Sequence, residues 1–248
     1  MPRLVAVATA ALFALFAAVS IGARPPSEPV AAAATVASAP APQPVVRYTP
    51  DPAPRLTATA ATDDVERTRR VLRAPSTFSI PVTGGVVPTA PELLPNSARA
   101  YRGGTHEGID FPVRTGTPVL AAAAGRISRI DYAYQEWSEP ARNAAIDNSR
   151  RLGYTPELIL DLIRGRQIWV DHGGGVVTRY AHLSAVAPLA RGDWVEPGQL
   201  IGYAGQSGFP EGGPHLHFEI RIGDTYLGAG IPDLAELRAS IARAFRPN

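Results

Sequence analysis

The 248-residue chain contains no cysteine and no lysine, and all 24 of its basic residues are arginine. The absence of cysteine excludes thiol nucleophiles, disulfide bonds, zinc–thiolate sites and a lipid-modified N-terminal cysteine. The absence of lysine excludes a Walker lysine, a Schiff-base lysine and a biotinyl or lipoyl attachment site. Excess charge of one sign is also lacking, because the net charge is only +2. The sequence therefore gives no reason to expect nucleic acid as a partner.

The remaining composition is that of a globular protein, with 45% hydrophobic and 19% charged residues. The length allows one domain of ordinary size together with additional segments. We expect the folded domain to occupy residues 78–248 and to be a monomer, although the sequence does not determine the oligomeric state. Residues 24–61 are rich in proline and alanine, which predicts an extended linker, and residues 62–77 predict a short helical segment.

The N-terminus has the pattern of an export signal. Arg3 precedes an uncharged apolar run from Leu4 to Gly22, and small Ala23 follows it. This pattern predicts a signal peptide over residues 1–23. The run also has close to the roughly 20 apolar residues that a membrane-spanning helix needs, so a retained membrane anchor is the alternative. In both cases we expect the rest of the chain outside the cytoplasm, in the periplasm, the cell envelope or the extracellular space.

Glycines and prolines punctuate short runs of β-type residues from Phe78 onward, which predicts an all-β core. The triplet Gly173–Gly175 separates two such runs and predicts a hairpin. The antiparallel sheet, or sandwich-like pair of sheets, is expected to contain strands at 109–111, 118–121, 125–130, 168–171, 176–180, 194–195, 200–203 and 216–222.

Residues 131–165 depart from this pattern, because their apolar residues follow a helical period. Ser138 is the expected N-cap of a helix that runs through Leu152 and stops at a glycine. Thr155 is the expected cap of a second helix over residues 157–164. The sequence therefore predicts a helical hairpin inserted between two strands.

Two helices are expected to have buried apolar faces. A C-terminal helix is expected over residues 233–245, with apolar residues at helical spacing that indicate core packing. In the inserted hairpin, the face expected to be buried consists of Leu158, Ile159, Leu162 and Ile163.

The most informative stretch is a His-x-His pair near the C-terminus, His215 and His217. Apolar residues alternate with these histidines, which is the period-2 pattern of a half-buried strand. Residues two apart on a strand point to the same face, so the two imidazoles and Glu219 should project side by side. The two imidazoles can therefore act as two metal ligands, or as one ligand and one acid/base.

A second pair of candidate ligands lies upstream, at His106 and Asp110. Glycine, isoleucine and proline after His106 favour loop and strand over helix, and residues four apart in an extended chain share a face. Glu107 then points elsewhere and is set aside as a catalytic base. Two imidazoles and one carboxylate leave a fourth position open, which is the pattern of a catalytic zinc site, although these ligand types do not exclude iron.

The two remaining histidines receive different interpretations. His182 lies in the phrase Arg179–Leu183 and is the available proton shuttle, together with the spare member of the His-x-His pair. His172 ends a strand beside the glycine turn. Because the coordination set is already full, we interpret it as a structural residue that is hydrogen-bonded by the glycine turn.

Taken together, His106-x-x-x-Asp110, Tyr180-x-His182-Leu183 and His215-x-His217 resemble the M23 family of zinc metallopeptidases, the lysostaphin- and LytM-like endopeptidases. The connecting phrases Gly116-Thr117-Pro118-Val119 and Gly192-Asp193-Trp194-Val195-Glu196-Pro197-Gly198-Gln199 are similar as well. The resemblance covers roughly residues 78–222 and is interrupted by the helical insertion.

The resemblance implies a LytM-type antiparallel β domain and one zinc ion. His106, Asp110 and His217 would be its ligands, and His182 and His215 would be the catalytic pair around the activated water. The implied substrates are the peptide stems of peptidoglycan, and the implied reaction is endopeptidase cleavage of their cross-links.

Three alternatives to an enzyme accompany this prediction, and the third, a purely structural protein, gives no reason for His106, Asp110, His182, His215 and His217 to occur together. An M23-like domain can be non-catalytic and activate or regulate another wall hydrolase, but such domains typically lack ligands that are present here. A carrier or binding module is the second, because the segments Thr117–Ala121 and Gly192–Gln199 also resemble biotinyl or lipoyl barrels, but the absence of lysine excludes the attachment chemistry of such carriers. For the insertion, a wall or lid that restricts the substrate groove and a packing or partner-binding element are both open.

Overall fold

The computed structural model describes residues 78–246, in which all the predicted strands lie. The expected export signal at 1–23, the linker at 24–61 and the short helical segment at 62–77 lie outside the described residues. Among residues 78–246, none of the helices is both long enough and apolar enough to cross a membrane.

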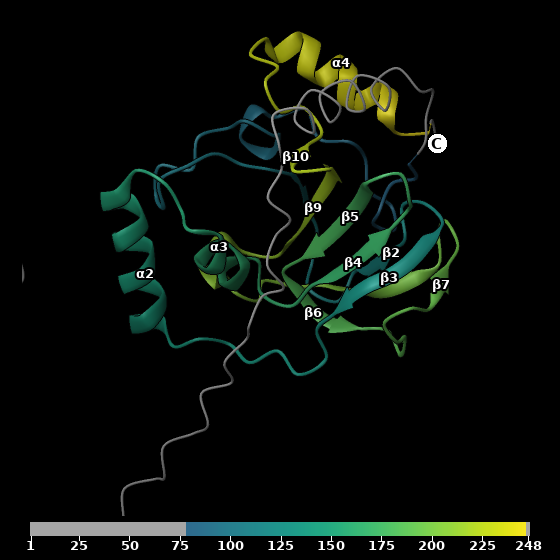
Figure 1. The fold of residues 1–248 in the computed structure, drawn as a ribbon, viewed down its shortest axis with the longest axis horizontal. Coiled ribbons are helices and arrows are strands. Elements are labelled where there is room, and N and C mark those ends of the chain that lie inside the picture. The colour runs from purple at the N-terminus through teal and green to yellow at the C-terminus, as the bar shows by residue number, and fades with distance from the viewer. Residues whose placement is uncertain (1–77, 247–248) are drawn as a thin grey trace, which may run out of the picture. The chain divides into compact units, whose positions relative to one another are not determined.

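Two antiparallel sheets form the domain (Figure 1). The larger sheet has seven strands in the order β1-β9-β5-β4-β3-β7, with β10 paired to β9, and the smaller has the order β2-β8-β6. The larger sheet contains β1 (Ile109–Pro112), β3 (Gly125–Ile130), β4 (Ile168–Asp171), β5 (Val176–Ala181), β7 (Trp194–Val195), β9 (His215–Ile222) and β10 (Thr225–Tyr226). The smaller contains β2 (Pro118–Leu120), β6 (Leu183–Val186) and β8 (Leu200–Ala204).

One hydrophobic core joins the two sheets. It takes Ile127 and Phe218 from the larger sheet and Val119 and Ile201 from the smaller, all at most 1% exposed. Along β9 the apolar residues enter this core, and the alternate residues form the opposite face. The all-β antiparallel fold predicted from the sequence is therefore confirmed.

Two short strands were not predicted, β6 and β10. No glycine or proline separates β5 from β6. The chain turns instead at His182, whose φ of 60° lies in the left-handed region. A histidine in that conformation carries no turn signal in the sequence, which explains why the boundary was missed.

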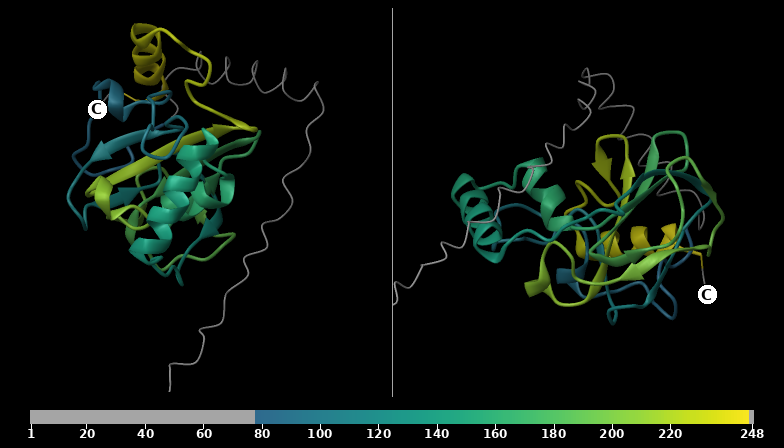
Figure 2. Two further views of the ribbon diagram at one scale, coloured as in Figure 1. Left: turned by 90° about the vertical axis from the view of Figure 1, so that its left-hand side faces the viewer. Right: turned by 90° about the horizontal axis from the view of Figure 1, so that it is seen from below.

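The inserted hairpin is present as two helices, α2 (Glu139–Leu152) and α3 (Glu157–Arg164). Ser138 caps α2 as predicted, because its side chain accepts a hydrogen bond from the backbone of Ala141. In Figure 1, α3 lies between α2 and the strands, and Figure 2 shows both helices away from α4 (Leu234–Ala244).

Two details predicted for α3 are wrong. Pro156 occupies the cap position, and the hydroxyl of Thr155 donates instead to the carbonyl groups of Arg102 and Gly103. The buried face also differs, since Leu158 is 57% and Leu162 36% exposed. The buried residues are Leu160, Ile163 and Arg164. Apolar periodicity cannot identify a buried arginine. The face that is buried in the structure is therefore rotated about the axis of α3 relative to the predicted face.

The C-terminal helix α4 packs as predicted. Asp233 caps it by accepting a hydrogen bond from the backbone of Glu236. Leu237 and Ile241 are at most 3% exposed, and Phe245 meets the ring of Phe111 edge-on at a centroid distance of 6.3 Å. This helix therefore closes the core and carries no site residue.

An ion pair attaches α3 to the sheet. Arg129 of β3 donates to both carboxylate oxygens of Asp161, at 2.6 and 3.2 Å, and Gln167 donates to the first of them. Burial raises the pKa of Asp161, but the hydrogen bonds and charge of Arg129 outweigh it and hold that pKa below 3.8. The pair therefore stabilises the folded state fully above pH 3.8, and its contribution is lost as the pH falls through the lower, folded-state pKa.

We expect Asp161→Asn to lower the free energy of unfolding at neutral pH by about 2 kcal/mol, because a charged hydrogen bond is lost. The difference from wild type should shrink once the pH is well below 3.8, where the wild-type carboxylate is protonated. Urea unfolding, monitored by tryptophan fluorescence, measures the free energy of unfolding at each pH. Asp147→Asn is the matched control, since Asp147 is 54% exposed in its ion pair on α2 and should change little. A difference for Asp161→Asn that does not vary with pH would contradict the assignment.

Candidate active site

The site lies on the face of β9 opposite the core, where β1 and β9 run antiparallel. Asp110 and His217 are register partners on these strands, so their side chains project to the same face. His106 precedes β1 by three residues and is 2% exposed. The structure thus brings together the three residues predicted as ligands, in a cluster that could hold a metal ion.

Hydrogen bonds set the tautomers of the two imidazoles in this cluster. Nδ1 of His106 lies 2.9 Å from the carbonyl oxygen of Leu94, which can only accept, so Nδ1 carries the proton and Nε2 has the lone pair. Nε2 of His217 lies 3.0 Å from a carboxylate oxygen of Glu219, which can only accept, so Nε2 is a donor and Nδ1 is the nitrogen that could bind a metal ion. Nε2 of His106 and Nδ1 of His217 both face the cluster.

The geometry of these atoms fits a divalent metal. Nε2 of His106, Nδ1 of His217 and Oδ1 of Asp110 offer ligand atoms that all lie within 4.8 Å of one another. The two ring nitrogens are 3.0 Å apart, and each has its opposite nitrogen engaged as a donor. A cation, either a proton or a metal ion, between these two nitrogens removes the repulsion between their lone pairs. The donor set of two imidazoles and one carboxylate is one that zinc accepts.

The charge of Asp110 also favours a cation at this position. Burial lowers the pKa of His106. Burial raises the pKa of Asp110, but His106 and His217 outweigh it and hold that pKa well below its ordinary value. Burial lowers the pKa of His217, and its hydrogen bonds to Asp110 and Glu219 reverse the sign and raise it. The carboxylate is therefore ionised and attracts positive charge to this position.

Arg99 contacts the second oxygen of Asp110 and was not singled out from the sequence. Its Nη2 lies 2.8 Å from Oδ2, while Oδ1 faces His106 and His217. The guanidinium thus orients the carboxylate and leaves Oδ1 as the ligand atom. No motif marks this arginine, because it lies in a loop, 11 residues before Asp110.

His182 and His215, the predicted catalytic pair, lie beside the cluster with their ring centroids 4.5 Å apart. Nδ1 of His182 donates to the carbonyl of Ser207 and Nδ1 of His215 to that of Gly213, each at 2.8 Å. Both rings therefore present Nε2 with a free lone pair. Nε2 of His215 is 3.8 Å from Oδ1 of Asp110, so this ring borders the ligand atoms.

The protonation of His182 suits a proton acceptor. Burial lowers the pKa of His182 well below its ordinary value, and the neighbouring His215 and His217 lower it further. The ring is therefore neutral at physiological pH. A neutral imidazole with an available Nε2 can accept a proton from water.

The other residues considered as candidates have structural partners. Both ring nitrogens of His172 are hydrogen-bonded, to the carbonyl of Ala124 and the hydroxyl of Thr178, rather than to the glycine turn that the sequence suggested. The hydroxyl of Tyr180 accepts from the backbone of Ala122 and from the hydroxyl of Thr178. Neither residue belongs to the cluster.

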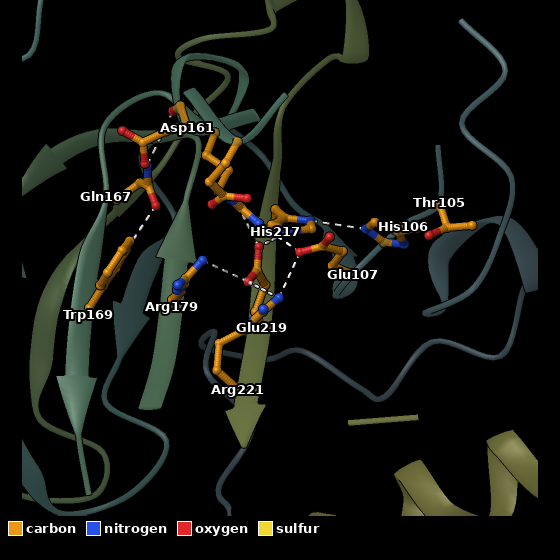
Figure 3. A network of polar contacts seen from close by, with 12 residues as sticks. Thr105, His106, Glu107, Asp161, Gln167, Trp169, Arg179, His217, Glu219 and Arg221 are labelled. Carbon is orange, nitrogen blue, oxygen red and sulfur yellow. Dashed lines mark hydrogen bonds and ion pairs between the residues drawn. The ribbon is translucent and has the colours of Figure 1, made fainter. Parts of the chain in front are cut away.

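Glu107 is also tied to other residues, because its carboxylate pairs with Arg164 and Arg221 at 2.9 and 2.7 Å. Glu219 completes this polar network beneath the ligands (Figure 3). Strand alternation in the sequence predicts that Glu219 lies on the same face as His217. It does not predict the contacts of Glu219 with arginines from other elements.

Glycine is required at position 108, between the two upstream ligands. A Cβ there would lie 2.6 Å from the carbonyl oxygen of Phe218 and 2.8 Å from Cε1 of His217. Any side chain would therefore displace the imidazole or separate β1 from β9.

All five site residues line one cavity of about 300 Å³. Its other walls include Tyr101 and Phe209, whose rings stack at a centroid distance of 4.8 Å. The inserted helix α3 contributes Leu160, Ile163 and Arg164 to the lining. The insertion is therefore a wall of the cavity that contains the site.

Comparison with known proteins indicates the family that the domain resembles. Residues 156–228 match the family model of Peptidase family M23. The chain is 36% identical over 117 residues to the DD-carboxypeptidase/endopeptidase Mpg of Neisseria meningitidis serogroup B, covering 47% of this chain and 20% of that protein. It is 29% identical over 117 residues to the peptidoglycan DD-endopeptidase ShyA of Vibrio cholerae, with coverage of 47% and 20%. Residues 156–228 therefore resemble the M23 peptidase domain.

Among solved structures, the catalytic domain of lysostaphin from Staphylococcus simulans is similar at 23% identity, over 69% of this chain and 97% of that one, with a TM-score of 0.38. The chain spans about one fifth of the length of the two curated relatives it matches. Similarity to them therefore concerns the domain, and not their whole length.

Proposed function

We propose that the protein is an exported, zinc-dependent endopeptidase that hydrolyses peptide bonds in peptidoglycan cross-links. The observation that carries this proposal is the convergence of three ligand atoms with two further imidazoles in one cavity of an M23 domain. The names of Mpg and ShyA support the bond class, and that of ShyA supports peptidoglycan as the substrate. Export rests on the apolar run in residues 1–23.

In this proposal His106, Asp110 and His217 hold the ion. Bound zinc supplies Lewis-acid chemistry, which polarises the scissile carbonyl and lowers the pKa of the attacking water. Arg99 and Glu219 orient two of the ligands through the hydrogen bonds described above.

The imidazoles of His182 and His215 move the protons. Their Nε2 atoms are free because the carbonyl groups of Ser207 and Gly213 engage both Nδ1 atoms. The pair takes the proton of the water that attacks the amide carbon. It then delivers a proton to the leaving amine as the C–N bond breaks, and its N–H group stabilises the developing oxyanion.

Digestion of purified peptidoglycan by the full chain tests the proposal. We expect soluble peptide fragments in the presence of zinc, no fragments after treatment with a chelator, and recovery when zinc is restored, because the residues alone do not activate the water. Chromatography and mass spectrometry of the products identify the bond that is cut.

A zinc-binding chain that releases no fragments from any peptidoglycan type would overturn the enzymatic proposal in favour of a regulator of another wall hydrolase. Equal release with and without the chelator would contradict the role of the metal. Both results can be obtained with the same preparation.

A further inference from the structure

Arg164 is the last residue of α3 in the helical insertion, and its side chain is only 3% exposed. Its three side-chain nitrogens contact three different carboxylates. Nε lies 2.6 Å from Oε1 of Glu219, Nη2 lies 2.9 Å from Glu107, and Nη1 lies 3.0 Å from Glu157. A buried guanidinium that is fully paired in this way has little freedom to move.

The contact with Glu219 connects Arg164 to the site. The same oxygen, Oε1, also accepts the Nε2–H of His217 at 3.0 Å. Glu219 is fully buried, so no water replaces either partner. A continuous chain of charged hydrogen bonds therefore runs from the insertion, through Glu219, to an imidazole of the metal cluster.

Two other arginines lie near Glu219 but do not replace Arg164. Arg179 and Arg221 approach the other oxygen, Oε2, at 3.5 and 3.6 Å. These distances are beyond those of good hydrogen bonds. Figure 3 shows both arginines below His217, at the carboxylate of Glu219. Among the described residues, Arg164 is thus the arginine that holds the oxygen facing the imidazole.

The backbone around Arg164 is fixed by the segments that carry the catalytic pair. Its carbonyl accepts the backbone N–H of His182 at 2.8 Å. Gly165 follows with a φ of 67°, and a Cβ there would lie 2.3 Å from the carbonyl oxygen of Ser207. The end of α3 therefore docks directly onto the loop whose carbonyl orients His182.

We propose that Arg164 is a positioning residue for the metal ligand His217. By fixing Oε1 of Glu219, it holds the imidazole in the orientation and tautomer that direct Nδ1 toward His106 and Asp110. The helical insertion is then a structural part of the metal site and not only a wall of the cavity. This inference rests on the metal site of the proposed function.

Zinc affinity of the full chain, measured by competition with a chromophoric chelator, tests the inference. We expect Arg164→Met to weaken zinc binding by about 10- to 100-fold, which is typical when a group that orients a metal ligand is lost. Arg164→Lys should recover part of this affinity, because it keeps the charge but lacks the planar fork. The spectrum of the cobalt-substituted protein reports the change at the ligands directly.

Arg129→Met is the matched control. Arg129 also attaches α3 to the sheet, through Asp161, but its contact with α3 involves none of the residues of the metal cluster. If Arg164 serves only to attach the helix, both variants should reduce thermal stability and neither should change the zinc affinity. We expect instead that only substitution of Arg164 changes the affinity.

A double-mutant cycle with Glu219→Gln tests whether Arg164 affects zinc affinity through Glu219. Because Arg164 acts through Glu219, Arg164→Met should weaken zinc binding much less in the Glu219→Gln background than in wild type. An equal loss in both backgrounds would overturn the inference. If Arg164→Met does not fold, wild-type zinc affinity in both Arg164→Lys and Glu219→Gln would overturn it. Absence of zinc binding by the wild type would instead reject the proposed function itself.

Discussion

His217→Ala is expected to abolish zinc binding and to reduce peptidoglycan cleavage by at least about 1,000-fold, since loss of the metal removes several kcal/mol of transition-state stabilisation. The substitution deletes Nδ1, one of the three converging ligand atoms. It leaves one imidazole and one carboxylate, too few for a stable tetrahedral zinc site. Zinc content by mass spectrometry and release of soluble fragments measure the two effects.

The fold should survive this change. The core side of β9 carries Leu216 and Phe218, and neither is altered. His172→Gln is the control, because His172 is a half-buried histidine hydrogen-bonded to Ala124 and Thr178, outside the cluster. It should keep zinc and activity. Stoichiometric zinc in His217→Ala would show that the ligand assignment is wrong.

The face of β9 could be predicted from sequence because strand alternation is local. Leu216, Phe218 and Ile220 mark the core side, and this places His217 and Glu219 on the other. The pairing of Asp110 with His217 spans 107 residues, as the hydrogen bond between them shows. No local pattern predicts such a register, so the sequence chemistry left open which imidazole joins His106 and Asp110, and the choice of His217 came from the family resemblance.

The contacts that orient the ligands could not be predicted. Arg99 reaches Asp110 through a loop, and Arg164 reaches Glu219 because α3 docks on the sheet face. Arginines on short helices usually lie in solvent, and their burial becomes visible only when the partner carboxylates are placed. The same burial explains why the apolar period gave the wrong face for α3, with Leu158 and Leu162 expected inside.

His215→Ala should affect the rate and leave the metal in place. The ring of His215 contributes none of the three ligand atoms, and its Nε2 lies 3.8 Å from the nearest oxygen of Asp110. We therefore expect zinc content and affinity close to wild type. Loss of a positioned acid/base group should lower kcat by about 100- to 10,000-fold. Zinc titration together with steady-state cleavage of a cross-linked muropeptide separates the two quantities.

The partner imidazole allows a sharper form of this test. His182 faces His215 at a ring distance of 4.5 Å and is held by a different carbonyl, so either ring can be removed without releasing the other. If the two act as one proton-transfer unit, the double variant should be little slower than the slower single variant. If the fold-reductions in kcat of the two single variants multiply in the double variant, the two rings have independent roles. A His215→Ala protein that loses its zinc would instead make His215 a ligand, and would reverse the distinction between the two histidines of the His-x-His pair.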